Sequence, residues 1–378
     1  MNLRRLKAIA KKEFIHVLRD PRSLMMGIGM PMILLFLFGY ALTMDVERVP
    51  LAVWDQANSV ESRELVSRFS GSRYFDLRIT TDNYRMIEEA IDRRQALIAL
   101  VIPPDFSRRL SRGETAVVQA IVDGSDPNTA TIALGYADAT ALVYSRQIAM
   151  EQLLRAGTSL DRIPALDLTP RVWFNSDMTS RNFIFPGLIA VVMMIMGAIL
   201  TSLCMAREWE SGTMEQLIAT PVTPLELIMG KLAPYFCIGI LDLILCVGVG
   251  QFVFQVPLRG SLWLLTPLAM LFLFGALSFG ILLSIITKSQ LLASQLALVT
   301  TVLPAFLLSG FIFPIENMPF PIRVVTHIVT ARYFVFILRG IYLKDVGLTL
   351  LWPEVLFLAS FGLIVTLLAV GKFRKSID

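Results

Sequence analysis

Residues 183–206 read FIFPGLIAVVMMIMGAILTSLCMA, a stretch without a charged side chain. A helix needs about 20 consecutive apolar residues to cross the hydrocarbon core of a bilayer, and this stretch is long enough. Further stretches meet the same requirement, which predicts six spans at residues 23–44, 183–206, 227–256, 262–287, 292–313 and 350–372. The sequence therefore predicts an α-helical membrane protein with six transmembrane helices.

The composition of the whole chain excludes several classes of protein. Of its 378 residues, 55% are hydrophobic and only 17% are charged, and the mean hydropathy is +0.65. Soluble domains carry about 25% charged residues, so a soluble enzyme and a disordered protein are excluded. The net charge of +4 does not indicate binding to nucleic acid, because basic charge beside long apolar runs orients a membrane protein.

Lysine and arginine near the ends of the spans predict the orientation. Seven basic residues precede the first span, and three follow the last one, at positions 372, 374 and 375. Because cytoplasmic segments carry an excess of such residues, we expect both termini to be cytoplasmic. Six spans then place residues 45–180 outside, 207–226 inside and 314–349 outside.

The first 22 residues form an amphipathic helix by pattern. Its apolar residues recur at steps of three and four, and they are Leu3, Leu6, Ala10, Phe14 and Val17. Such a helix is typical of an elbow lying in the headgroup layer, where it would contact the lipid bilayer. A plain topology signal is the alternative for so basic a segment.

The segment 45–180 differs from the rest of the chain. Its residues 45–177 contain 15 arginines and 19 acidic residues, a net charge of −4, and no cysteine that could form a disulfide. Short apolar runs at 49–54, 75–80, 96–102 and 116–122 alternate with amphipathic runs at 60–69, 84–93, 105–111 and 129–154. We therefore expect an extracytoplasmic α/β domain inserted between the first and second spans.

The remaining residues, 181–378, are predicted to form a transmembrane domain with five spans. Between its last two spans, residues 314–321 read PIENMPFP, and three prolines in eight residues exclude a regular helix. The residues that follow are too polar to span and too apolar for a solvated loop. A re-entrant helical hairpin over 314–345, dipping into the outer leaflet, fits this pattern.

The chain lacks the residue patterns of most catalytic sites. It has only two histidines, His16 and His327, and no nucleotide-binding P-loop, so we expect no metal site and no bound cofactor. If transport is driven by ATP, another subunit must hydrolyse it. Asp242 is the remaining candidate for an intramembrane polar site, either as a substrate or relay group or as a packing contact.

Residues 206–221 read AREWESGTMEQLIATP and place acidic residues where the positive-inside rule expects basic ones. On a single helix, Glu208, Gly212 and Glu215 would share one face. Such a helix just below a span is typical of a docking surface, with carboxylates available to a partner's arginines. The alternative is a solvated turn whose charges keep it out of the lipid.

These residues carry a family resemblance. The segment 207–217, the later Gly230-Lys231-Leu232 and the stretch LSGFIFP at 308–314 resemble the permease subunits of type-two ABC exporters. Short sequence motifs of the outer domain, such as IPPDF at 102–106, resemble those of the drug-efflux subgroup with a large periplasmic domain. The resemblance extends over essentially the whole chain.

The resemblance implies a half-transporter of the bacterial inner membrane that moves drug-like or amphiphilic molecules outward. Two permeases, identical or homologous, would join two ABC ATPase subunits, which bind ATP and Mg. A cytoplasmic coupling helix at 207–220 would dock in the ATPase. A periplasmic adaptor protein and an outer-membrane channel are further expected partners. The coupling residues carried over are Arg207, Glu208, Glu210, Gly212, Thr213 and Glu215.

Other functions remain open at this point. The same fold could export a lipid or a polysaccharide. A membrane sensor or adaptor could use the outer domain to bind a ligand, and it would need no coupling surface. A membrane-embedded enzyme acting on lipid-linked substrates is disfavoured, because the acid, base and metal residues of such a site are missing.

Overall fold

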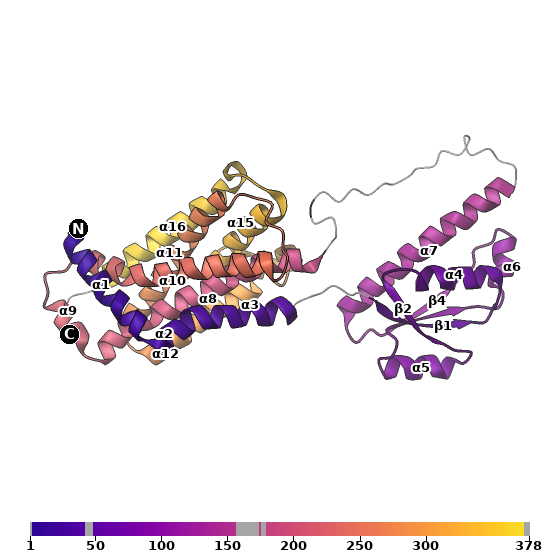
Figure 1. Cartoon of the computed structure of the whole chain (residues 1–378), viewed down its shortest axis with the longest axis horizontal. Helices are drawn as coiled ribbons and strands as arrows, with labels where there is room; N and C mark the ends of the chain where they lie inside the picture. Colours follow the sequence, from indigo (N-terminus) through magenta and orange to yellow (C-terminus); the bar gives the residue numbers. More distant parts are fainter. Residues whose placement is uncertain (1, 42–47, 156–173, 175–178, 374–378) are drawn as a thin grey trace. The chain divides into compact units, whose positions relative to one another are not determined.

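The structure is a computed structural model that describes residues 2–41, 48–155, 174 and 179–373. The chain divides into two compact units (Figure 1). We call Met1–Thr43 together with Val172–Asp378 the membrane unit, and Met44–Arg171 the α/β unit. The end of the predicted first span, 42–44, and residues 45–47, 156–173 and 175–178 of the predicted outer domain lie outside the described residues.

The α/β unit contains a four-stranded sheet in the order β2-β1-β3-β4. Its strands are β1 (Val49–Asp55), β2 (Phe75–Thr80), β3 (Ile98–Ile102) and β4 (Gln119–Val122). β1 is parallel to both β2 and β3, whereas β4 is antiparallel to β3. The four strands predicted from the short apolar runs are confirmed, although β3 and β4 begin two and three residues later than predicted.

Helices cover both faces of this sheet (Figure 1). One face packs against α4 (Val60–Ser70), α6 (Phe106–Ser111) and α7 (Pro127–Arg155), and the other against α5 (Tyr84–Asp92). Burial on both sides explains why every residue of β3 is apolar and enclosed. The α/β fold predicted for this segment is therefore present.

Five helices among the described residues are long and apolar enough to cross a membrane. They are α8 (Ser180–Glu210), α10 (Pro224–Phe252), α11 (Leu262–Thr287), the run Gln290–Leu307 and α16 (Leu348–Lys372). The run Gln290–Leu307 comprises α12 (Gln290–Ala297), the π-helix η3 (Leu298–Val302) and α13 (Leu303–Leu307). The protein is therefore a multi-pass α-helical membrane protein, in agreement with the fold class predicted for it.

α8 lies at the centre of the membrane unit and packs most closely against α11. Small residues allow their backbones to approach, because a Cβ on Gly280 would collide with Thr201 and with the backbone of Ala198. Gly197 faces Ala276 in the same interface. The Thr201 hydroxyl also lies 2.8 Å from the carbonyl oxygen of Leu277. Such small-residue contacts are how helices associate in the absence of water.

The predicted first span, 23–44, coincides with a helical run that begins at Pro21. It consists of α2 (Pro21–Leu24), the π-helix η1 (Met25–Gly29) and α3 (Met30–Ala41). Its apolar part, Met25–Ala41, is shorter than the five long helices. This helix packs against α8 and α10.

The predicted fifth span, 292–313, is wrong at its end. The helix stops at Leu307, and residues 308–314 form a bend. Gly310 has a φ of +80°, a left-handed conformation that a helix cannot continue through and that glycine adopts without steric cost. Apolar composition alone could not predict this break in the helix.

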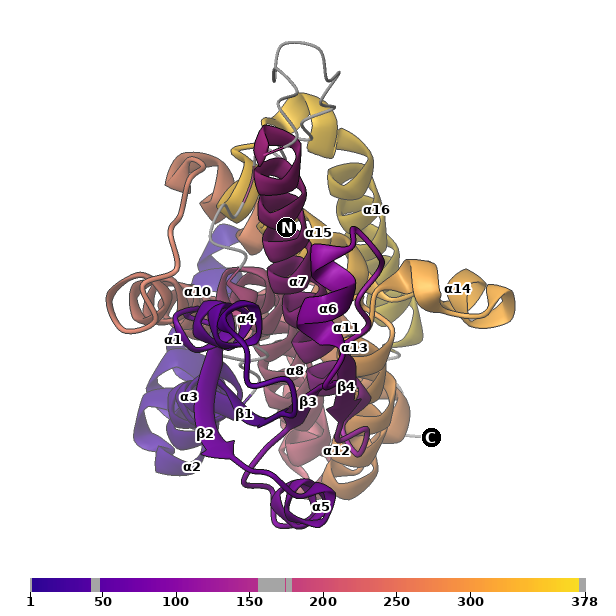
Figure 2. The ribbon, with the colours of Figure 1, turned by 90° about the vertical axis from the view of Figure 1, so that its right-hand side faces the viewer.

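The segment predicted as a re-entrant hairpin contains η4 (Ile315–Asn317), α14 (Phe320–Thr326) and α15 (Thr330–Lys344). α14 and α15 are bent by 81° relative to each other. α15 packs into the core through Phe334, Leu338 and Ile341, whereas α14 projects from the membrane unit with Phe320 largely exposed (Figure 2). Taken as one broken span, this pair would raise the number of candidate spans to six.

Candidate functional site

The end of α8 carries the acidic motif predicted from the sequence. α8 runs to Glu210, and after a break at Ser211 and Gly212 the short helix α9 (Thr213–Ile218) begins. Gly212 has a φ of +71°, so the helix cannot continue through it. The prediction of one coupling helix over 207–220 with Glu208, Gly212 and Glu215 on one face is therefore wrong, since Glu208 belongs to α8 and Glu215 to α9.

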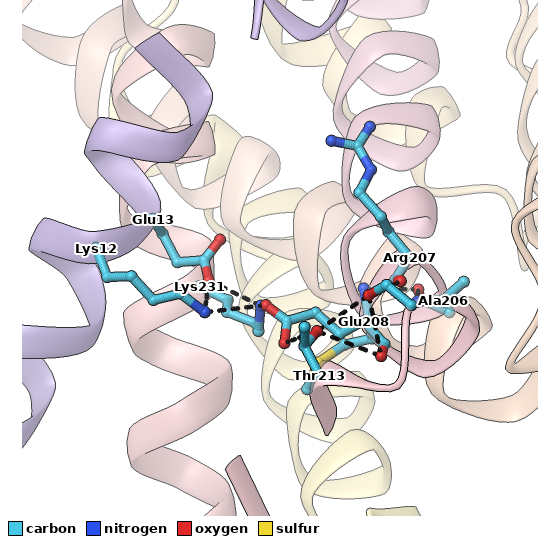
Figure 3. A network of polar contacts seen from close by, with 10 residues as sticks. Lys12, Glu13, Ala206, Arg207, Glu208, Thr213 and Lys231 are labelled. Carbon is cyan, nitrogen blue, oxygen red and sulfur yellow. Dashed lines mark hydrogen bonds and ion pairs between the residues drawn. The ribbon is translucent and has the colours of Figure 1, made fainter. Parts of the chain in front are cut away.

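A buried lysine links this motif to two other helices (Figure 3). Lys231 of α10 is 1% exposed, and its Nζ lies 2.8 Å from Glu208 Oε1 and 2.9 Å from Glu13 Oε1. Glu13 lies on α1 (Leu3–Arg19), which also contributes Lys12 at 3.3 Å from Glu208 Oε1. We call Lys12, Glu13, Glu208 and Lys231 the lysine cluster. It joins α1, α8 and α10 through charge-assisted hydrogen bonds.

Glycine and capping residues bring α1 and α10 together at this cluster. A Cβ on Gly230 would lie 2.7 Å from Ile9 Cγ2, so only glycine permits the observed approach of α1. Glu226, within the first turn of α10, accepts hydrogen bonds from the backbone N–H groups of Asn2 and Thr223. The start of α1 is therefore tied to the start of α10.

The amphipathic pattern of residues 1–22 does form a helix, but its buried face differs from the predicted one. Ile9, Glu13 and Val17 are buried, whereas Leu3 and Phe14 are exposed. α1 therefore packs against α10 along one face and leaves part of its predicted apolar face free.

Arg207 points away from the lysine cluster (Figure 3). Its Nη1 lies 2.8 Å from Asp20 Oδ2, and the Ser23 hydroxyl donates to the same oxygen at 2.7 Å. Burial opposes ionisation of Asp20, but the hydrogen bonds from Ser23 and Arg207 outweigh it and lower the pKa of Asp20 to about 2. Asp20 follows the last residue of α1, so this ion pair fastens the second end of that helix to α8.

The opposite side of the motif contacts the start of the helical run Gln290–Leu307. Glu210 accepts a hydrogen bond from the backbone N–H of Gln290 at 2.8 Å. The Lys288 ammonium lies 4.7 Å from the centre of the Trp209 ring, a cation–π contact. One turn earlier, the backbone N–H of Ala206 donates to the Ser284 hydroxyl of α11 at 2.8 Å. The end of α8 is thus held on all sides by other segments of the membrane unit.

The part of the motif beyond Gly212 faces solvent. The Thr213 hydroxyl donates to Glu208 Oε2 at 3.0 Å, and Met214 is fully buried beneath α9. Glu215 and Gln216 are exposed, and Glu215 forms no ion pair with any described residue. We therefore call the exposed helix α9 the platform, and the end of α8 that supports it the base. Of the predicted coupling residues, Arg207, Glu208 and Glu210 form that base, while Glu215 lies free on the platform.

Asp242, the predicted intramembrane polar residue, is not part of this arrangement. It lies on α10 eleven residues beyond Lys231, a rise of about 16 Å along the helix. Its side chain is buried, at 3% exposure. The described residues also contain no cluster of three or more His, Cys, Asp or Glu side chains that could hold a metal ion.

Two features of the sequence indicate the lysine cluster, although the docking prediction did not use them. Lys231 follows Gly230 inside an otherwise apolar run. Glu13 is the only acidic residue among the first 19, which include seven lysine, arginine or histidine residues. Charged residues buried in proteins are almost always paired. Glu208 was predicted to be available to a partner's arginines, but in the structure both of its oxygens have partners within the chain.

Known proteins resemble this chain over nearly its full length. Residues 21–370 match the family model described as ABC-2 family transporter protein. The chain is 38% identical to the "Probable multidrug ABC transporter permease YbhS" of Escherichia coli K12, covering 100% of this chain and 99% of that one. It is 31% identical to "Probable multidrug ABC transporter permease YbhR" of the same strain, with 99% of each chain covered.

A more distant relative is the "Inner membrane transport permease YhhJ" of Escherichia coli K12, 28% identical over 87% of this chain and 86% of that one. Because these relatives are named as permeases, this chain is a transport component and not itself an enzyme. Family membership also implies an ABC ATPase as its partner. The match over residues 21–370, together with 38% identity along the whole chain, places this protein in the ABC-2 family of transporters.

Proposed function

We propose that this chain is the permease subunit of an ATP-driven exporter that moves drug-like or amphiphilic molecules out across a bacterial inner membrane. Two of the relatives described above, YbhS and YbhR, are named as probable multidrug permeases, and these names support this substrate class over a lipid or a polysaccharide. ATP and Mg would be bound by separate ABC ATPase subunits, and a second permease, identical or homologous, would complete the transporter.

The proposal assigns a side of the membrane to each part. Both termini and residues 207–220 lie on the cytoplasmic side, and the α/β unit lies in the periplasm. The basic residues of α1 and those at 372–375 support this orientation. In the periplasm, the α/β unit would meet an adaptor protein that leads to an outer-membrane channel.

The observation that carries the proposal is the contact of α9 with the lysine cluster, in which Thr213 bonds to Glu208. An ATPase that binds α9 would act on Thr213 and Glu215, and Thr213 bonds directly to Glu208. Glu208 in turn is tied through Lys231 to α10 and through Lys12 to α1. A displacement of α9 would therefore be transmitted to three helices at once, which is what an element that couples ATP binding to transport must do.

The test is a charge reversal on the exposed platform. We expect Glu215→Lys to lower ATPase co-purification with the permease and to abolish substrate-stimulated ATP hydrolysis by the reconstituted complex. Glu215 has no ion pair within the described chain, so the change should leave the fold intact. Glu88→Lys, an exposed charge reversal on α5 of the α/β unit, is the matched control and should retain both properties. Undiminished hydrolysis in the Glu215 variant would exclude α9 as the docking element.

Glu210→Ala and Gly212→Leu test the base of the platform. Glu210→Ala removes the bond to Gln290, and leucine at position 212 must adopt a positive φ that costs about 1–2 kcal/mol. Both should reduce substrate-stimulated hydrolysis while the helices remain inserted. A membrane sensor that uses only its α/β unit would be insensitive to all three substitutions.

A further inference from the structure

The short helix α14 leaves the membrane unit sideways (Figure 2). The Thr330 hydroxyl at the start of α15 lies 3.6 Å from the sulfur of Met194, near the middle of α8. Arg339, nearer the end of α15, donates to the carbonyl oxygen of Phe183, near the start of α8. α15 therefore runs antiparallel to α8 from mid-span depth. Because α14 is bent by 81° from α15, it extends across the bundle at about that depth.

α14 and its neighbouring residues carry exposed side chains of two kinds. Phe320, at the start of α14, and Ile328, just beyond its end, are 77% and 75% exposed. Glu316 and Arg323 are exposed as well, and neither forms an ion pair with a described residue. An arginine that faces hydrocarbon inside the membrane is costly. This mixture of apolar and charged groups therefore fits a surface covered by protein better than one covered by lipid.

A cavity lies beside the end of α14. Its volume is about 440 Å³, within the range of about 300–1,000 Å³ that is typical of ligand pockets. Its walls come from α8, α11, α16, the run Gln290–Leu307 and the turn between α14 and α15, and they include Met194, Phe279, Val299, Ala305, Ile328 and Phe361. Val299 and Ile328 are themselves exposed, so the cavity has its mouth on the surface of the membrane unit.

The walls of this cavity favour an apolar occupant. No charged residue is among the described residues that line it. The hydroxyl groups of Thr300, Thr301 and Thr330, which do line it, each donate a hydrogen bond within the chain. A polar group would therefore find no free side-chain partner there, whereas an aromatic ring would bury its apolar surface without loss.

Phe320 and this cavity lie on the same surface, one at each end of α14. The seven residues of α14 separate them by about 10 Å. A two-fold axis between them would bring Phe320 of one copy to the cavity of another, and the same contact would form twice. It would also let Glu316 of one copy face Arg323 of the other. The surface is thus complementary to itself in shape and in charge.

We propose that two permeases meet through α14, with Phe320 of each copy inserted in the apolar cavity of a second copy of this chain. This inference rests on the proposed function, which requires a second permease, and it names the surface that holds two identical copies together. The inserted ring would contact Met194 on α8, the helix whose end forms the base. A movement of α8 in one copy would therefore reach α14 of the other.

Disulfide cross-linking in bacterial membranes tests the contact. Two full-length copies with different affinity tags and without native cysteines are produced together, one carrying Phe320→Cys and the other Val299→Cys. We expect oxidation to link them, because a disulfide requires Cβ atoms within about 4.5 Å of each other. Leu363→Cys is the matched control for Val299→Cys. Leu363 is 60% exposed on α16 but does not line the cavity, so it should not be linked to position 320.

Truncation of the ring tests its contribution to dimer formation. Phe320→Ala in both copies should lower their co-purification in detergent about tenfold or more, because a buried aromatic anchor typically carries much of the binding energy of an interface. Trp263→Ala is the matched control. It also removes an exposed aromatic side chain, 91% exposed near the start of α11, and should leave co-purification unchanged.

The inference is overturned if position 320 is linked to position 363 as readily as to position 299, or to neither, or if Phe320→Ala copies pair as well as unmodified ones. Copies that co-purify without the link between positions 320 and 299 would exclude this surface and leave the second permease of the proposed function standing. The measurements need neither ATP nor an ATPase subunit. A failure of the Glu215 test would therefore leave them unaffected.

Discussion

Lys231 is the residue on which the arrangement of α1, α8 and α10 depends. A fully buried ammonium group is tolerated only when it is paired, and here two carboxylates from different helices neutralise it. The pairing explains a feature of the sequence that apolar periodicity cannot, namely a glycine followed by a lysine inside a span. Gly230 brings α1 close, and Lys231 then holds it there.

Removing the lysine should therefore destabilise the membrane unit. Lys231→Ala removes the buried partner of Glu13 and Glu208 and leaves them only the largely exposed Lys12. Loss of one partner of a buried ion pair typically costs about 3–5 kcal/mol of unfolding free energy. Thermal unfolding of the purified protein in detergent measures this loss. Lys7→Ala, which removes an exposed lysine from the same helix α1, should change the stability by less than about 0.5 kcal/mol. Equal stability of the two variants would show that Lys231 does not hold α1.

Asp20 predicts a dependence of stability on pH. Its pKa is lowered from 3.8 to about 2 in the folded protein, so the ionised form is favoured by folding. The resulting stabilisation is fully present above the unfolded pKa of 3.8 and is lost as the pH falls through about 2. Asp20→Asn should therefore be less stable than the unmodified protein at neutral pH, and the difference should shrink below pH 3.8. Unfolding curves of both proteins between pH 2 and pH 7 check this, and a difference that does not change with pH would contradict it.

Sequence reasoning located these residues only in part. It identified Arg207, Glu208 and Glu210 as a charged motif, because acids at the inner end of a span are unusual. It did not pair Glu208 with Lys231 or Arg207 with Asp20, because each pair joins residues far apart in the chain. Periodicity describes one helix at a time, whereas ion pairs between helices depend on how the helices are packed.

At the scale of elements, helix ends were harder to predict than helices. Five of the predicted spans correspond to long apolar helices, but the fifth ends six residues before its predicted boundary. The errors fall at Gly212 and Gly310, which both have positive φ. An apolar or amphipathic pattern can continue through a glycine even where the helix ends, so the pattern alone cannot locate the break.

The α8–α11 interface gives a prediction at this scale. Gly280→Ala should destabilise the protein by about 1–3 kcal/mol, because its methyl group would collide with Thr201 and the backbone of Ala198. Gly248→Ala, on α10, places its methyl group where no heavy atom lies within 4 Å and should be neutral or slightly stabilising. Thermal unfolding of both variants measures the contrast. Similar stabilities would mean that the two helices can move apart without cost.

For the whole molecule, the sequence separated two kinds of segment correctly by charge and hydropathy. The α/β unit is acidic and contains a sheet, whereas the membrane unit is apolar and helical. Composition and periodicity suffice for this division because burial in lipid and burial in a soluble core demand different sequences. They predicted a hairpin over 314–345 but could not predict the angle of 81° between α14 and α15, since that angle depends on what each helix packs against.

The orientation of the chain is testable with single cysteines at Ser125 and Ser211. Both positions are exposed, the first in the α/β unit and the second between α8 and α9. In a background where Cys204, Cys237 and Cys246 are replaced, a membrane-impermeant thiol reagent added to intact cells should label only the cysteine at position 125 once the outer membrane is permeabilised. Labelling of both positions from the same side would contradict the proposed topology.

The length of α8 has a mechanical consequence. Its 31 residues form one helix about 46 Å long, and its tightest backbone contact with α11, near Gly197, lies in its interior. That contact divides the helix into an arm of about 26 Å towards Ser180 and one of about 20 Å towards Glu210. A tilt about it carries the two ends in opposite directions, so a push that closes the helices at one end spreads them at the other. A rigid rod with an internal pivot is therefore enough to convert closure on one side into opening on the other.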